Sequence, residues 1–109
     1  MPEIDRDQVQ TMIESDADVR VVEVLEEKEY QKFHLPGAVN VPLGDDFDER
    51  IQAALPAKHE PVIVYCASEQ CDASPKAARR MEALGYDRVY DYAAGKTDWK
   101  EAGLPTETG

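Results

Sequence analysis

Two cysteines, Cys66 and Cys71, lie five residues apart in one short polar segment, and their thiols are the side chains best suited to nucleophilic chemistry. Cys66 directly follows Val62–Tyr65, a run of β-branched and aromatic residues that is typical of a strand buried on both faces. Residues 67–73, ASEQCDA, have the composition of a loop. A helix after this loop would direct backbone N–H groups and the positive end of its dipole toward Cys66. We therefore expect Cys66 to have thiolate character.

The helix that we expect after the loop covers residues 76–84. Ser74 and Pro75 are the residue types that favour the N-cap and the first helical position, and Gly85 is typical of a C-terminal stop. Strand, loop and helix would together form an anion-binding site for sulfur chemistry. Besides the nucleophile Cys66 and the second thiol Cys71, we expect the substrate to contact Ala67, Ser68, Glu69, Gln70, Asp72, Ala73 and Ser74.

Short strands alternate with short helices along the rest of the chain. Further strands are predicted over residues 19–24, 38–41 and 88–92, and further helices after Asp5, over 27–33, over 47–55 and around Trp99. This alternation predicts an α/β fold with a parallel sheet covered on both faces. Ligands of such sheets lie beyond the carboxyl ends of the strands, where Cys66 is placed. The 109 residues fit a single domain, 1–109.

Charge and composition exclude several functions. The formal net charge of −11 argues against nucleic acid and anionic membrane as partners. No apolar run approaches membrane-spanning length and the first residues lack a signal-peptide pattern, so we expect a cytoplasmic location. We expect no cofactor, because dinucleotide and phosphate-loop fingerprints are absent. His34 and His59 are not at ligand spacing with the cysteines, so we expect no metal site.

Several motifs of the chain resemble the rhodanese-like (sulfurtransferase) domain family. Residues 34–42, HLPGAVNVP, resemble its first signature, and residues 62–66, VIVYC, resemble the strand that enters its active-site loop. Gly95, Trp99 and residues 103–105 match its closing G-x3-W-x3-G-L-P signature. The resemblance implies a three-layer sandwich with a central, mostly parallel sheet flanked by helices. It also implies sulfane-sulfur transfer through a persulfide on Cys66, from thiosulfate, polysulfide or a persulfide to cyanide, a thiol or an acceptor protein.

The sequence departs from that family's pattern in three places. Glu23 and Leu25 stand where Asp-x-Arg is common, so the internal ion pair of that arginine is absent. Phe33 replaces a glycine, and the loop after Cys66 contains acidic residues and no arginine or lysine. Backbone amides would therefore have to hold a persulfide without a cation. Because Glu69 and Asp72 would repel a dianion, we expect weak thiosulfate:cyanide activity.

Alternatives remain for the cysteines and for the activity. Cys71 either accepts the persulfide or closes a disulfide with Cys66, or is a small loop residue without a redox role. A related phosphatase or arsenate reductase is excluded because the Cys-x5-Arg pattern of those enzymes would require arginine at position 72, which is Asp72 here. A binding module that carries sulfur, senses redox state or mediates an interaction is the alternative to an enzyme. The enzyme requires the Cys66 sulfur to be reachable from solvent. The sequence gives no firm sign of oligomerisation.

Overall fold

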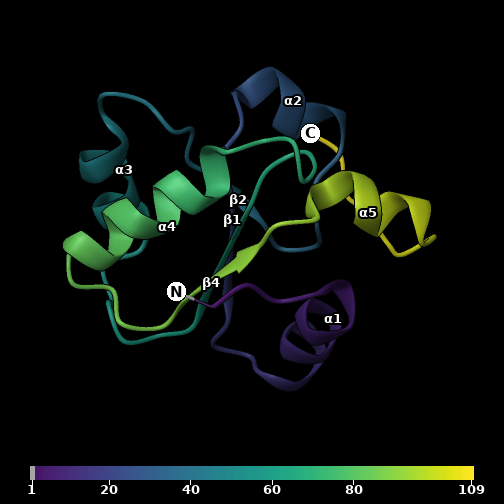
Figure 1. Cartoon of the computed structure of the whole chain (residues 1–109), viewed down its shortest axis with the longest axis horizontal. Helices are drawn as coiled ribbons and strands as arrows, with labels where there is room; N and C mark the ends of the chain where they lie inside the picture. The colour runs from purple at the N-terminus through teal and green to yellow at the C-terminus, as the bar shows by residue number, and fades with distance from the viewer. Residues whose placement is uncertain (1) are drawn as a thin grey trace.

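The computed structural model describes residues 2–109, and its centre is a four-stranded parallel sheet (Figure 1). The strand order is β2-β1-β3-β4, with β1 at Arg20–Glu23, β2 at Val39–Asn40, β3 at Val62–Tyr65 and β4 at Val89–Tyr92. All four residues of β3 are buried, as expected of a β-branched run between two neighbouring strands. The predicted α/β fold is confirmed.

Helices cover both faces of the sheet. They are α1 (Arg6–Ser15), α2 (Glu27–Lys32), α3 (Phe47–Ala54), α4 (Ala73–Ala83) and α5 (Gly95–Glu101). Figure 1 shows α3 and α4 on one side of the strands and α1 and α5 on the other. A hydrophobic core lies on each face of the sheet, and alternate side chains of β3 pack into one or the other. Val64 packs on the α4 side, and Ile63 packs on the side of α1 and α5. Within residues 2–109, none of the helices combines the length and apolar character needed to cross a bilayer.

The start of α4 differs from the prediction. The helix begins at Ala73 with Asp72 at the N-cap position, so Ser74 is not the cap and lies in the first turn. Pro75 fits at the third helical position because the first amides of a helix have no intrahelical acceptor. The Ser74 side chain is buried instead of capping the helix. The end is as predicted, since Gly85 adopts a positive φ of 102°.

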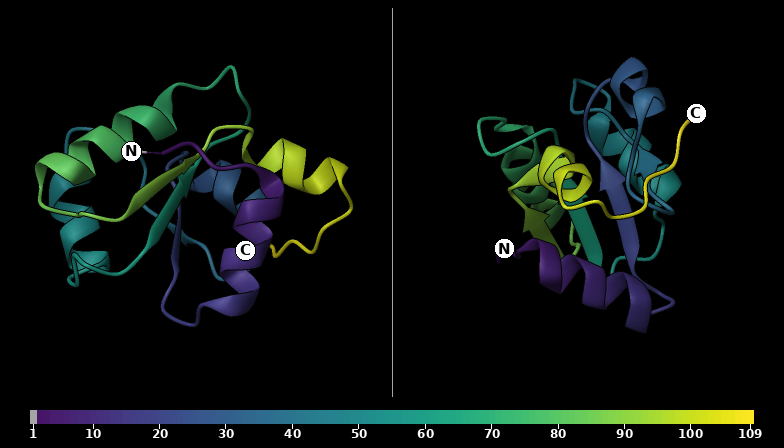
Figure 2. Two further views of the ribbon diagram at one scale, coloured as in Figure 1. Left: turned by 60° about the horizontal axis from the view of Figure 1, so that its bottom comes forward. Right: turned by 90° about the vertical axis from the view of Figure 1, so that its right-hand side faces the viewer.

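Both ends of the described chain pack on the domain. The Ile4 amide donates to the carbonyl of Asp91 on the edge strand β4, and Asp5 and Gln8 form a capping box at α1. At the other end, Glu107 and His34 exchange backbone hydrogen bonds of 2.9 Å. Figure 2 shows this C-terminal segment passing α5 and returning toward α2. The last residues therefore help to fix the segment that enters β2.

An ion pair between Glu23 and Lys96 is buried at the carboxyl end of β1. The Lys96 Nζ lies 3.0 Å from Glu23 Oε2, and the two side chains are 4% and 0% exposed. The ammonium also donates to the carbonyls of Glu29 (2.7 Å) and Phe33 (2.8 Å), which uses its three protons. The Tyr65 hydroxyl donates to Glu23 Oε1 at 2.8 Å. The cation of this buried pair comes from Lys96, near the other end of the chain.

Removing Lys96 should destabilise the fold more than removing both charges. Lys96→Met leaves the Glu23 carboxylate buried without its cation, and we expect a loss of about 3–5 kcal/mol in the free energy of unfolding. Glu23→Gln with Lys96→Met should recover at least about 1 kcal/mol of that loss. Urea unfolding measures both, with exposed Lys28→Met as the control. Equal losses in the single and double variants would contradict this account.

Candidate functional site

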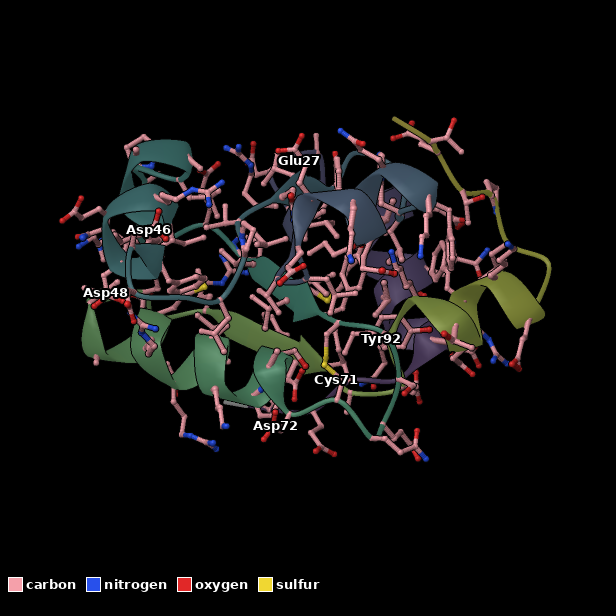
Figure 3. All side chains as sticks on the ribbon, turned by 90° about the horizontal axis from the view of Figure 1, so that it is seen from above. Glu27, Asp46, Asp48, Cys71, Asp72 and Tyr92 are labelled. Atoms are coloured by element: carbon pink, nitrogen blue, oxygen red, sulfur yellow. A yellow bond between two sulfur atoms is a disulfide. The ribbon has the colours of Figure 1, made fainter. Side chains whose placement is uncertain are left out.

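Cys66 and Cys71 meet at the carboxyl end of β3, where a disulfide joins them with Cα atoms 6.4 Å apart. In Figure 3 this bond is drawn in yellow beside the label of Cys71, close to the start of α4. The Cys71 amide donates to the Ser68 carbonyl at 3.0 Å, which closes a turn and folds the loop back. The loop therefore takes the conformation in which the two sulfur atoms come together, one of the alternatives left open by the sequence.

The Cys66 side chain is fully buried, contrary to the expectation of a sulfur that solvent can reach. In the disulfide form, the partly exposed Cys71 covers it from the loop side. The hydroxyl oxygen of Ser74, also buried, lies 3.6 Å from Cys66 Sγ on the α4 side. The sequence could not predict this closure because it depends on how the loop folds. Reaction at Cys66 therefore requires the disulfide to be opened first.

The first turn of α5 holds the start of the loop. The Lys96 amide donates to the Cys66 carbonyl and the Thr97 amide to the Ala67 carbonyl, both at 3.0 Å. Gly95 precedes them with a φ of 75°, and a Cβ there would lie 2.6 Å from the Cys66 carbonyl oxygen. Only glycine allows this approach, which gives a physical reason for the Gly95 of the closing signature.

The other predicted contact residues lie either in the exposed part of the loop or in the first turn of α4. Glu69 and Gln70 are exposed, and Ser68 donates to the Gln70 side chain at 2.9 Å. Within residues 2–109, the amides from position 67 to position 70 donate to no protein acceptor. Asp72 is also exposed, and its hydrogen bond to Lys76 (3.0 Å) holds the pKa of the carboxyl below its usual range. Ala73 and Ser74, predicted in the loop, belong to α4.

Asp91 is a residue of the site that the sequence analysis missed. Asp91 lies on β4, paired in register with Val64 of β3, and is 1% exposed. Val64 is two residues before Cys66 in the sequence. Asp91 Oδ1 has no hydrogen-bond partner among the described residues. Burial raises its pKa, the nearby Glu3 raises it further, and the Ser74 hydroxyl and Arg79 oppose the shift. An aspartate within the apolar strand was the signal that could have identified it.

His34 and Trp99 are buried and pack within the domain. His34 stacks on Tyr30 with ring centroids 3.8 Å apart, and its Nδ1 donates to the Tyr30 carbonyl at 2.9 Å. Trp99 is buried and donates to the Pro105 carbonyl. Among residues 2–109, histidine, cysteine, aspartate and glutamate form no group of three that could hold a metal ion.

Asp91→Asn should change how stability depends on pH. A carboxyl whose pKa is raised by folding contributes stability below its unfolded pKa, and this is lost as pH rises through the folded pKa. Relative to Asp91→Asn, the wild-type chain should therefore lose up to about 1.4 kcal/mol per pH unit across that window. Urea unfolding from pH 3 to pH 8 measures the difference, and a constant difference would refute the account.

Comparison with known proteins identifies the family. A model described as Rhodanese-like domain matches residues 5–102. PspE, a thiosulfate sulfurtransferase of Escherichia coli, is 40% identical over 82 residues, which cover 74% of this chain and 69% of PspE. YrkF of Bacillus subtilis, named as a candidate sulfur carrier protein, is 30% identical over 99 residues, 91% of this chain and 51% of YrkF. This chain thus spans about half of YrkF.

The crystal structure of the BH2092 protein from Bacillus halodurans superposes with a TM-score of 0.85 at 27% identity, over 98% of this chain and 77% of that one. The chain belongs to the rhodanese-like domain family.

Proposed function

We propose that this domain is a sulfurtransferase that carries sulfane sulfur as a persulfide on Cys66. The reduced Cys66 thiolate attacks the outer sulfur of thiosulfate, a polysulfide or a persulfide and keeps that atom as Cys66–S–S⁻. The bond from this sulfur to the rest of the donor breaks, and sulfite, a shorter polysulfide or a thiolate leaves with the electron pair. Cyanide, a thiol or an acceptor protein then removes it. The observation that carries the proposal is the place of Cys66, at the end of the central strand and beside the first turn of the 11-residue helix α4.

The charge of the persulfide can be held without a cationic side chain. The amides from position 67 to position 70 have no acceptor within residues 2–109, and the dipole of α4 favours negative charge at its N-terminus. The buried Ser74 hydroxyl oxygen lies 3.6 Å from Cys66 Sγ. The first turn of α4 belongs to a regular helix, so its dipole requires little reorganisation when the charge forms.

Sulfur loading of reduced protein tests the proposal. The chain is reduced, exposed to inorganic polysulfide without oxygen, desalted and analysed by mass spectrometry. We expect one added sulfur atom on the Cys66 peptide, transferred to cyanide as thiocyanate. Cys66→Ser should gain none. If neither the reduced wild-type chain nor reduced Cys71→Ser gains sulfur on Cys66, the proposal is overturned.

The acidic loop should weaken turnover of thiosulfate. Glu69 and Asp72 lie on the exposed side of the loop, where a dianion would have to approach. Glu69→Gln should raise kcat/KM for thiosulfate about 2- to 5-fold, and adding Asp72→Asn, which also releases Lys76 from its ion pair, should raise it further.

Steady-state thiocyanate formation at low ionic strength measures this effect. Glu14→Gln, an equal change of net charge on the exposed surface of α1, is the matched control. An equal response of Glu14→Gln would mean that overall charge, and not the loop, limits thiosulfate use. High salt should reduce the gain because it screens exposed charges.

A sulfur carrier or redox-sensing module with little turnover is the second candidate. The specific observation in its favour is the complete burial of Cys66 in the disulfide form. A persulfide that loads on Cys66 but passes to no small acceptor would favour this module.

A further inference from the structure

The contact between the two sulfur atoms points to an activity beyond transfer to an acceptor. We propose that Cys71 resolves the Cys66 persulfide and releases its outer sulfur as hydrosulfide, so that the domain also acts as a persulfide reductase. This inference rests on the proposed persulfide at Cys66.

The step balances without an external oxidant. The proton of the Cys71 thiol passes to the outer sulfur of Cys66–S–S⁻. The Cys71 sulfur attacks Cys66 Sγ, the inner sulfur of the persulfide, and forms the Cys66–Cys71 bond. The bond between Cys66 Sγ and the outer sulfur breaks, and its electron pair leaves with HS⁻. The outer sulfur is reduced to sulfide and the two cysteines are oxidised to the disulfide. A dithiol then reopens the disulfide by exchange and is itself oxidised.

The loop geometry favours attack by Cys71 at the inner sulfur. The turn closed by the Cys71 amide and the Ser68 carbonyl carries the Cys71 sulfur onto Cys66 Sγ. Since both thiols belong to one short loop, the reaction is intramolecular and benefits from a high effective concentration. Cys71 also lies just before Asp72, the N-cap position of α4, where the helix dipole favours a thiolate.

Exposure also assigns different roles to the two cysteines. Cys66 has no exposed surface in the closed loop, whereas Cys71 is partly exposed. An external dithiol would therefore meet Cys71 first and release Cys66 as the leaving thiolate. Once the loop is open and Cys66 carries a persulfide, an external acceptor and Cys71 would compete for that persulfide.

Single-turnover release of sulfide tests the inference. Reduced wild-type chain and Cys71→Ser are loaded with inorganic polysulfide and desalted, all without oxygen, and then followed by sulfide assay and mass spectrometry. Wild type should release one sulfide per loaded chain and lose two hydrogens relative to the reduced chain. Cys71→Ser should keep its persulfide at least about tenfold longer. Cys71→Ala should behave like Cys71→Ser, and exposed Ser15→Ala like wild type.

Each other outcome has a definite meaning. If both chains load sulfur and keep it equally long, Cys71 does not resolve the persulfide and the inference is overturned. If the outer sulfur is found on the Cys71 peptide, Cys71 attacks the outer atom and relays it, which also overturns the inference. If neither chain gains sulfur on Cys66, the proposed function fails and this inference fails with it.

Discussion

The first turn of α5 holds both the loop that carries the cysteines and the buried charges at the edge of the sheet. Its amides at Lys96 and Thr97 bind the carbonyls of Cys66 and Ala67, while the Lys96 side chain reaches Glu23. Gly95 allows this approach because it has no Cβ and tolerates a positive φ. The position of Cys66 is therefore fixed by a segment about thirty residues later in the chain.

The loop beside Cys66 is acidic, and its amides from position 67 to position 70 donate to no protein acceptor among residues 2–109. The loop contains Glu69 and Asp72, and the whole chain has a net charge of −11. A cationic pocket would attract small anions generally, whereas amides held close to one sulfur atom act mainly on charge formed at that atom. The proposed persulfide would suit such a loop better than free thiosulfate would.

Burial of polar groups near the reacting sulfur has two different consequences. Glu23 and Lys96 are paired and fully hydrogen-bonded, so they fix the packing of α2, α5 and the sheet. Asp91 is buried, its Oδ1 has no hydrogen-bond partner within residues 2–109, and burial raises its pKa. A buried ion pair supports the architecture, and a buried single carboxyl makes stability sensitive to pH.

Local pattern in the sequence determined the order of strands and helices, the central place of Val62–Tyr65 and the position of Cys66 at its end. These features follow from residue types a few positions apart, through β-branched runs, helical spacing and turn residues. Tertiary structure alone decided that α4 begins at Ala73, that Lys96 pairs with Glu23, that Asp91 lies below the site and that Cys71 covers Cys66. Each of these depends on segments meeting in space, and the spacing of residues along one segment does not contain that information.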